Sequence, residues 1–324
     1  MVSTASLAGC APAHMLTQPA SPMCRTVASE DGRQVRWMSP LDADDRKHLR
    51  AWCDAVGPVV LRNPEGQAAS GDRPLAIVSW NMAVGRGDLP ALMRDVRASQ
   101  PDADLIFLLQ EAYRTDVVPD DCPPGSGRAK AIAQPRPPGS EDIVAVATRL
   151  GLHLAYAPSM RNGTDCAREP REDRGNAILS TLPISNVAVI ELPFAQQRRV
   201  ALAATVGGGR RAIHVMSIHF DTIFGHQRMG EGIWQAAQIL GWTDRFVIAG
   251  DFNTTLPGDG GRARMRERFK ELDCGKGGTH ELGRRLDRAF VASGDPALAC
   301  ATERDRFGSD HHPLVALVPV SGPF

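Results

Sequence analysis

The chain has no long apolar run, few lysines and no net charge. No stretch approaches the ~18 apolar residues that a membrane-spanning helix needs, so no segment is expected to cross a bilayer. The 37 basic and 37 acidic side chains cancel to a formal net charge of zero. Nothing in this global charge therefore argues for a nucleic-acid clamp or for a surface that adheres to anionic membranes, and local charged patches stay possible. Arginine outnumbers lysine heavily, which is more typical of codon bias than of phosphate recognition; the lysines are Lys47, Lys130, Lys270 and Lys276.

The seven cysteines include no CxxC pair, which argues against a zinc knuckle or a thiol redox site. The segment LAGC that ends at Cys10 resembles a bacterial lipobox, in which the cysteine is lipidated and the preceding residues are removed. Residues 1–10 would then be a truncated leader, because they are short and carry no Lys or Arg; a misplaced start or a chance match are the alternatives. The lipobox predicts an exported bacterial lipoprotein, periplasmic, at the cell surface or membrane-anchored through Cys10.

Removing Cys10 as a lipid attachment point leaves six cysteines, which suits three disulfides in an oxidising compartment. Six cysteines allow 15 pairings. We expect nearest neighbours along the chain to pair, and the alternative is a set of scattered free thiols. The expected pairs are Cys24 with Cys53, Cys122 with Cys166, and Cys274 with Cys300.

The first part of the chain, residues 11–73, is predicted to be an N-terminal extension and linker. Its one amphipathic stretch runs from Asp42 to Val56 and predicts a helix that packs on the main domain through Trp52. Residues 74–324 are predicted to form the main domain, whose strands and helices alternate irregularly. Some strands are separated by helices and others follow one another directly, which predicts mixed sheets covered by helices.

Two helix starts and a long loop mark the main domain. Asp88 is expected to cap a helix that ends at Gln100, and Ser140 to cap a helix over 141–150. Residues 114–140 are rich in Pro and Gly and predict a surface loop, while a further helix is expected over 230–240. The expected strands cover 75–81, 105–109, 152–156, 177–180, 187–192, 201–206, 212–219, 246–249 and 314–318.

Polar residues stand next to three of these apolar runs. Glu111 follows the run at 105–109, and Asp251 and Asn253 follow the run at 246–249. Asp310 and His311 precede the run at 314–318. Side chains at strand ends lie on the rim of a sheet, where sites form, whereas strand middles form the core. These residues are therefore the candidate functional set.

The residue types in this set suit phosphate chemistry with a hard metal ion. In an extended segment Asp251 and Asn253 project together while Phe252 points to the core, so one carboxylate and one amide can hold a water and a phosphate oxygen. Glu111 has no cysteine or histidine beside it, which favours Mg²⁺ or Mn²⁺ over zinc. His311 needs a partner to fix its tautomer, and Asp287 at the edge of another apolar segment is the candidate.

Together and in this order, seven segments of the chain resemble the endonuclease/exonuclease/phosphatase superfamily, which includes pancreatic deoxyribonuclease, bacterial sphingomyelinases and inositol polyphosphate 5-phosphatases. The resemblance covers about residues 74–318. It implies a four-layered α/β sandwich, with two mixed β-sheets flanked by helices, that hydrolyses phosphate esters with a divalent metal. The matching segments are 79–81 (SWN), 110–111 (QE), 175–180 (GNAILS), 217–219 (SIH), 250–253 (GDFN), 285–287 (RLD) and 309–313 (SDHHP).

The resemblance also implies a role for each matching polar residue. Glu111, Asn81 and Asp310 would bind the metal, Mg²⁺ or Mn²⁺. Asp251 would orient and deprotonate the attacking water, and Asn253 would donate to the phosphate. The other implied residues serve the phosphate: His311, steadied by Asp287, His219 from the facing sheet, and Asn176 as a contact to a phosphate oxygen.

Some features depart from the family pattern or favour structural roles. Residues 181–183 (TLP) stand where many relatives have Arg and an aromatic, and the loop over 221–232 also differs. His312 is expected to turn away from the site, and His153 and His214 to be structural; Asp221 is ambiguous. The basic residues Arg161, Arg168, Arg171 and Arg174 alternate with acidic ones, which favours a solvated mixed-charge loop over a substrate cradle.

We expect a monomeric hydrolase acting on a phosphate ester: a nucleic acid, a phospholipid head group or a small ester. The neutral charge argues against duplex DNA, and the lack of an aromatic-rich loop argues against a lipid surface. The alternative is a non-catalytic binding module that keeps the fold without turnover. The intact set of acidic, amide and imidazole residues argues against that alternative, because a decayed enzyme would have lost at least one.

Overall fold

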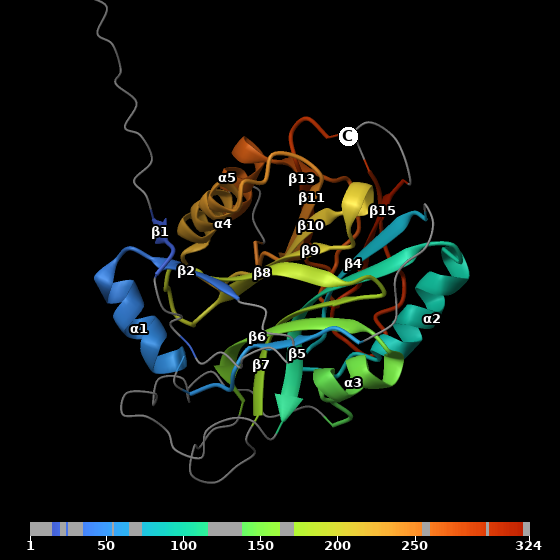
Figure 1. Cartoon of the computed structure of the whole chain (residues 1–324), viewed down its shortest axis with the longest axis horizontal. Helices are drawn as coiled ribbons and strands as arrows, with labels where there is room; N and C mark the ends of the chain where they lie inside the picture. Colours follow the sequence, from blue (N-terminus) through green and yellow to red (C-terminus); the bar gives the residue numbers. More distant parts are fainter. Residues whose placement is uncertain are drawn as a thin grey trace, which may run out of the picture.

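The computed structural model describes residues 15–19, 24, 35–53, 55–64, 73–115, 138–162, 172–254, 260–295 and 298–319. Two β-sheets form its centre (Figure 1). The eight-stranded sheet has the order β1 (Leu16–Thr17), β2 (Arg36–Pro40), β8 (Ile184–Glu191), β9 (Val200–Val206), β10 (Ile213–His219), β11 (Phe246–Asp251), β13 (Asp287–Val291) and β12 (Lys270–Glu271). The seven-stranded sheet has the order β14 (Ala299–Thr302), β15 (Leu314–Val318), β4 (Leu75–Asn81), β5 (Asp104–Thr115), β7 (Glu172–Ser180), β6 (His153–Arg161) and β3 (Val60–Arg62).

Both sheets are mixed, and helices cover their outer faces. The pairs β10–β11 and β4–β5 are parallel, whereas β9–β10 and β11–β13 are antiparallel. Helices α4 (His226–Leu240) and α5 (Gly260–Arg268) lie on the outer face of the eight-stranded sheet, and α2 (Leu89–Ser99) and α3 (Ile143–Leu150) on that of the other (Figure 1). The expected four-layered α/β sandwich is confirmed.

Three apolar clusters hold the four layers together. The largest fills the space between the sheets and takes alternate residues of each strand, such as Val247 and Ala249 on β11. Ile248 on the same strand belongs instead to the cluster beneath α4 and α5. This alternation is the period-two pattern of a strand buried on both faces. On β10 the expected shared face is also found, because Ile213 and Val215 join the central cluster.

The N-terminal extension adds strands to both sheets. Strand β2 pairs in parallel with β8, β1 pairs with β2, and β3 pairs with β6. Helix α1 (Ala43–Cys53) carries the expected contact residue Trp52, which is 4% exposed and packs against Met160 of β6. A domain boundary at residue 74 stays a prediction, but the residues on its N-terminal side complete the edges of the sandwich.

Two of the three expected disulfides are found. Cys24 pairs with Cys53 and Cys274 with Cys300, at Cα–Cα distances of 5.2 and 4.4 Å. The third expected pair, Cys122 with Cys166, and the lipobox at Cys10 lie outside the described residues. No described helix is both long and apolar enough to span a membrane.

Local capping explains where the helices begin. Asp88 accepts a hydrogen bond from the Ala91 N–H at 2.8 Å, as expected for the cap of α2. The cap of α3 is Asp142, which accepts from the N–H groups of Val144 and Ala145, so the prediction of Ser140 was wrong. The helix expected over 230–240 begins earlier, at His226.

Candidate active site

Three neighbouring strands bring His219, Asp251 and Asp287 to one edge of the eight-stranded sheet. In the strand register His219 lies opposite Asp251, and Asp251 lies opposite Asp287. The parallel strands β10 and β11 end at this edge and the antiparallel β13 begins there. Gly250 permits the close approach of β10, because a Cβ at this position would lie 1.9 Å from the Ile218 carbonyl oxygen. Residues far apart in the sequence therefore meet side by side.

The facing sheet closes over this edge. Asn81, the last residue of β4, donates from Nδ2 to the Asp251 Oδ2 at 3.0 Å. The segment before β15 is tied to β4 by two hydrogen bonds: the Ser309 hydroxyl donates to the Asn81 carbonyl oxygen at 2.6 Å, and the Trp80 indole N–H to the His311 carbonyl oxygen at 3.0 Å. These bonds fix Asp310 and His311 against the eight-stranded sheet.

Asp251 is the centre of the cluster. Its Oδ2 lies 3.6 Å from the His219 Nε2 and 3.7 Å from the His311 Nε2. The carboxylate is 2% exposed, and burial raises the pKa of Asp251 to about 6, although the nearby charge of His311 opposes that rise. A carboxylate with a pKa near 6 is ionised at neutral pH and still accepts a proton readily.

The two histidines that flank Asp251 have opposite charge states. His311 Nδ1 lies 2.8 Å from Asp287 Oδ2, and although burial acts the other way, this carboxylate raises the pKa of His311 to about 10. At neutral pH His311 is therefore an imidazolium. Burial, followed by the positive charge of Arg199, holds the pKa of His219 well below its usual value, so that ring is neutral.

Arg199 also determines the tautomer of His219. The Arg199 Nη1 lies 3.2 Å from the His219 Nδ1. A guanidinium only donates hydrogen bonds, so Nδ1 must be the acceptor, and the neutral ring then carries its hydrogen on Nε2. That Nε2 lies 3.6 Å from the Asp251 Oδ2.

Glu111 lies inside a strand, not at the end of one. Strand β5 runs on to Thr115, and its register with β7 shifts between Leu109 and Ala112. Glu111 sits in this bulge with a φ of +51°. A bulge redirects one side chain of a strand, and here the Glu111 side chain remains 19% exposed, with its Oε2 4.0 Å from Arg174 Nη1.

Asn253 and Asn176 both use amide hydrogens within the fold. Asn253 has a φ of +51°, and its N–H donates to the Asp251 Oδ1, so this segment is a turn and not the expected extended stretch. Its Nδ2 donates one hydrogen to the Phe220 carbonyl oxygen. Asn176 donates both Nδ2 hydrogens to carbonyl oxygens, of Val200 and Ser217, and so bridges the two sheets. A phosphate contact by Asn176, which stays a prediction, would have to replace one of these bonds.

Groups of His, Cys, Asp and Glu with metal-ligand spacing occur at two overlapping places in this region of the described chain. One contains Asp251, Asp287 and His311, and the other His280, Asp310 and His311. His280 was not foreseen from the sequence, because it stands seven residues from Asp287 in a segment without periodicity. Its Nε2 lies 3.7 Å from the Asp310 Oδ2, and its ring meets that of His311 edge-on at 4.8 Å.

The three histidines that were expected to be structural contact other parts of the fold. His312 contacts the Glu303 carbonyl oxygen, His214 stacks on Trp242, and His153 contacts Asn63. Arg174 departs from expectation: it is 4% exposed within β7 beside Glu111, so it is not part of a solvated loop. Arg161 is likewise buried, and Arg168 and Arg171 lie outside the described residues.

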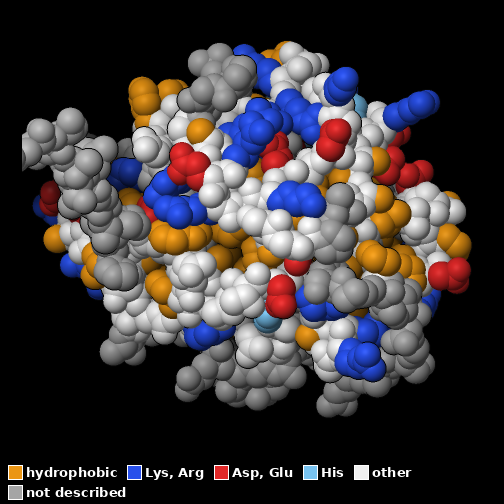
Figure 2. All heavy atoms as spheres, turned by 90° about the horizontal axis from the view of Figure 1, so that it is seen from above, with side chains coloured by type: hydrophobic (Ala, Val, Ile, Leu, Met, Phe, Trp, Pro, Cys, Tyr) orange, Lys and Arg blue, Asp and Glu red, His pale blue; other side chains and the backbone are white. Residues whose placement is uncertain are grey.

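Although the chain as a whole is neutral, its charges are unevenly distributed over the surface. On the face seen from the side of α5, basic side chains gather with acidic ones between them (Figure 2). Around Glu271 lie three arginines within 3.5 Å, namely Arg262, Arg266 and Arg288. Three cations around one carboxylate leave a positive excess, and Arg288 is the neighbour of Asp287 on β13.

The loops that flank β11 at this edge expose apolar side chains. Five large apolar residues are exposed in the described chain, and Ile223, Phe224 and Leu282 are three of them, at 60%, 60% and 66%. Ile223 and Phe224 follow β10, and Leu282 precedes β13. Because these strands lie on either side of β11, the two apolar tips flank the Asp251 edge.

The fold and this edge define a sandwich of two facing sheets with acidic, amide and imidazole groups where the sheets meet. The chain belongs to the endonuclease/exonuclease/phosphatase family, whose model matches residues 78–311. No curated protein matches the chain.

Solved structures of low sequence identity share the fold. An endonuclease/exonuclease/phosphatase from Beutenbergia cavernae is 20% identical, with a TM-score of 0.54 over 77% of this chain and 72% of that one. The human Nocturnin catalytic domain, solved with a bound sulfate anion, is 16% identical, with a TM-score of 0.50 over 75% and 93%. A family protein from Bacteroides thetaiotaomicron is 14% identical, with a TM-score of 0.51 over 76% and 97%.

Proposed function

We propose that the protein is a divalent-metal-dependent phosphoric ester hydrolase whose water is activated by Asp251. The observation that carries this proposal is the position of Asp251. This buried carboxylate accepts from Asn81 at 3.0 Å and lies between a neutral and a charged imidazole at 3.6 and 3.7 Å. Phosphoryl transfer needs charge neutralisation and in-line positioning, and this set of groups offers both without a Ser or Cys nucleophile.

Asn81, Glu111 and Asp310 would hold the metal. All three offer oxygen ligands, and the carboxylates of Glu111 and Asp310 are 19% and 33% exposed, so an ion there would keep some of its waters, as Mg²⁺ and Mn²⁺ do. Among the described residues the Asn81 Oδ1 accepts from the Ala83 N–H alone, at 3.0 Å, which leaves a lone pair for the ion. When bound, such a metal supplies Lewis-acid neutralisation of the phosphate.

The protein's own groups divide the remaining work. Asp251 orients the attacking water and accepts its proton, for which a pKa of about 6 suits neutral pH. The His311 imidazolium, held by Asp287, donates to a phosphate oxygen as charge builds on it, and the second Nδ2 hydrogen of Asn253 donates as well. His219 adds a neutral Nε2–H donor, because Arg199 occupies its Nδ1.

The decisive experiment is a substrate panel. Purified protein with Mg²⁺ or Mn²⁺ is assayed against plasmid DNA, RNA, phospholipid vesicles, inositol phosphates and simple phosphomonoesters, with Asp251→Asn and His311→Ala as inactive controls. Hydrolysis that depends on both residues and stops with EDTA supports the proposal. If nothing is cleaved, the protein is the alternative, a non-catalytic binding module. If both variants keep full activity, the roles proposed for Asp251 and His311 are wrong.

A phospholipid head group is the substrate class that the exposed rim favours. Ile223 and Phe224, with Leu282 across β11, are aliphatic and aromatic tips beside the Asp251 edge. Exposed apolar side chains on the loops beside a site suit a lipid–water interface. Ile223→Ser with Phe224→Ser should lower turnover on anionic phospholipid vesicles by about tenfold and leave a soluble diester unaffected. Equal turnover of vesicles by the variant and the natural chain would contradict this substrate class.

Export as a lipoprotein, attachment through Cys10 and a monomeric state complete the proposal. The two disulfides of the described chain support an oxidising compartment. Mass spectrometry of protein isolated from the producing cells tests lipidation, and light scattering tests the monomer. A mature protein that retains residues 1–9 would contradict the lipid anchor.

A further inference from the structure

Arg199 is a buried cation without a carboxylate partner. Its side chain lies just before β9, is 3% exposed, and donates from Nη1 to the His219 Nδ1 at 3.2 Å. No carboxylate oxygen of the described residues comes within the 4.0 Å of an ion pair, and its Nε has no hydrogen-bond partner among them. A neutral imidazole nitrogen does not compensate a positive charge.

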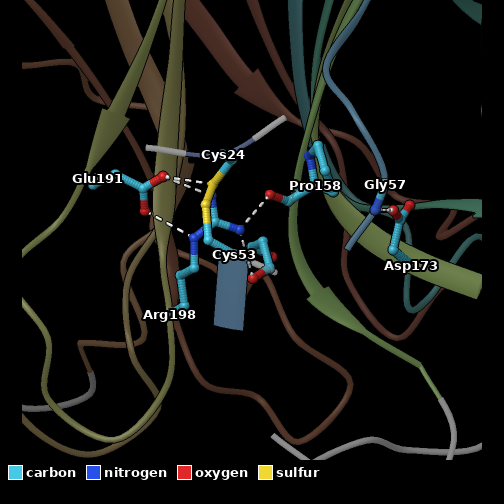
Figure 3. The surroundings of a disulfide bond; sticks show 8 residues. Cys24, Cys53, Gly57, Pro158, Asp173, Glu191 and Arg198 are labelled. Carbon is cyan, nitrogen blue, oxygen red and sulfur yellow. Dashed lines mark hydrogen bonds and ion pairs between the residues drawn. A yellow bond between two sulfur atoms is a disulfide. The ribbon is translucent and has the colours of Figure 1, made fainter. Parts of the chain in front are cut away.

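Two other buried arginines, Arg198 and Arg114, are paired with carboxylates, as Figure 3 shows for Arg198. Arg198 donates to both oxygens of Glu191, at 2.6 and 2.8 Å, and to the carbonyl oxygens of Pro158 and Ser159. Arg114 donates to both oxygens of Asp173, at 3.0 and 2.5 Å. The fold therefore provides carboxylates for buried guanidiniums elsewhere but does not provide one for Arg199.

The carboxylates closest to Arg199 are committed to other groups. Asp221 accepts from the backbone N–H groups of Gln196, Gln197 and Thr222. Asp251 accepts from Asn81, and Glu111 lies beside Arg174. Burial lowers the pKa of Arg199, and the charge of Arg174 adds to this effect. A buried charge that lacks its counterion costs several kcal/mol, so such a residue is the natural ligand of an anion from outside the chain.

We propose that Arg199 binds an anionic oxygen of a phosphate group and that it forms, with His219, an anion subsite beside Asp251. That this phosphate belongs to the substrate rests on the proposed function; that the site takes a phosphate rests on the unpaired guanidinium alone. The Nε–H of Arg199 donates to the phosphate oxygen, and the His219 Nε2–H, whose tautomer Arg199 fixes, donates to the same group. The arginine is thus both a ligand and a positioning residue.

Phosphate binding by the metal-free protein tests the subsite. Isothermal titration of inorganic phosphate, with EDTA present, compares the natural chain with Arg199→Met, Arg199→Lys and the exposed control Arg97→Met. Loss of a charge-assisted bond should weaken phosphate about 10- to 100-fold in Arg199→Met. The lysine variant should retain part of the affinity, and the Arg97 control all of it. Unchanged affinity in Arg199→Met overturns the subsite.

Thermal stability separates a ligand from a structural arginine. Removing an uncompensated buried charge should raise the midpoint of Arg199→Met in phosphate-free buffer by about 2 °C or more. Added phosphate should then stabilise the natural chain but not this variant. A large fall in the midpoint, with phosphate stabilisation retained, would show a structural role and overturn the proposal.

Two further readouts distinguish this inference from the hydrolase proposal. Nitrogen-15 spectra should show the His219 hydrogen on Nε2 in the natural chain and a mixture of tautomers in Arg199→Met; a single unchanged tautomer contradicts the positioning role. If no ester is hydrolysed while phosphate binding still depends on Arg199, the subsite stands and the hydrolase proposal fails. If esters are hydrolysed while Arg199→Met binds phosphate normally, the subsite fails alone.

Discussion

Two buried charge clusters lie only one residue apart along the chain, at Arg198 and Arg199, and they are built in opposite ways. At Arg198 every charge has a partner at 2.6–2.8 Å, and the Cys24–Cys53 disulfide packs against the pair (Figure 3). At Arg199 the described residues offer the cation no carboxylate within ion-pair distance, and nearby Asp251 lies 3.6 and 3.7 Å from its two histidines.

The comparison distinguishes charges that stabilise the fold, such as the Arg198–Glu191 pair, from charges such as Arg199 that we propose bind a ligand. Pairing within the chain compensates the loss of water around Arg198 and Glu191, so that cluster is complete as it stands. In the cluster around Asp251, two carboxylates of adjacent strands, Asp251 and Asp287, share one imidazolium, and a neighbouring arginine is unpaired. The proposed metal ion and anionic substrate would complete such a cluster. Four changes to these clusters would break or sharpen the contrast.

The largest effect is expected from Asp251→Asn, which removes the proposed base. Activity on any cleaved substrate should fall about 10²- to 10⁴-fold, because general-base catalysis contributes that much. The variant should still fold, since the amide keeps the shape of the carboxylate and its one oxygen can accept one of the two bonds that Asp251 accepts, from Asn81 and from the Asn253 N–H. Initial rates with Mg²⁺ measure the loss, and a variant that keeps more than half of the activity would contradict the assignment.

Glu191→Gln should destabilise the fold by about 3–5 kcal/mol, because it leaves Arg198 buried and uncompensated. Urea unfolding followed by fluorescence measures the change. Arg199→Met in the other cluster is the matched comparison, and it should be neutral or stabilising. Equal destabilisation by both variants would remove the distinction between the two clusters.

The disulfide beside Arg198 should contribute about 2–4 kcal/mol, because it closes a chain segment of 29 residues. Cys24→Ala with Cys53→Ala should lower the unfolding free energy by this amount. The Cys274→Ala and Cys300→Ala pair, with a separation of 26 residues, is the control for a disulfide away from the cluster. If only the control pair loses stability, the first disulfide does not stabilise this region.

A smaller effect, about 1–3 kcal/mol, is expected from the titration of Asp251 in metal-free protein. Its folded pKa is raised to about 6 from 3.8. A raised carboxyl pKa contributes stability that is present below pH 3.8 and lost as the pH rises through 6. Asp251→Asn lacks this loss, so its stability relative to the natural chain should increase between pH 4 and 7. A constant difference across that range would show that Asp251 is not perturbed.

Several parts of the site were predictable because they are local. The apolar runs of β11 and β15 are read from adjacent residues, and the Asp287 partner of His311 was expected at the edge of another apolar segment; Asp287 Oδ2 lies 2.8 Å from His311 Nδ1. The bulge at Glu111 was not predictable, because it depends on how β5 pairs with β7 across a gap of some 60 residues. The turn at Asn253 was missed although one of its bonds is local, from the Asn253 N–H to the Asp251 Oδ1. The second bond, from Asn253 Nδ2 to the Phe220 carbonyl oxygen, joins residues 33 positions apart and is not visible in the sequence.

The buried arginines show most clearly what the sequence alone could not predict. The sequence treats Arg198 and Arg199 as equivalent, and places Arg174 in a mixed-charge loop. Their different partners follow from the two strands that flank β9 in the eight-stranded sheet: Glu191 on β8 reaches Arg198, whereas His219 on β10 reaches Arg199. In the sequence, Arg198 and Arg199 are simply two consecutive basic residues before a strand of small apolar residues. This pattern does not show which of the two arginines has a carboxylate partner.

The sequence alone determined the family, the layered α/β architecture and most of the polar residues of the candidate site, because periodicity, capping and short motifs are local properties of the chain. The tertiary structure decided which charges are neutralised. Burial and pairing depend on groups brought together from both sheets, so the charge states of His219 and His311, the raised pKa of Asp251 and the missing partner of Arg199 exist only once the two sheets have met.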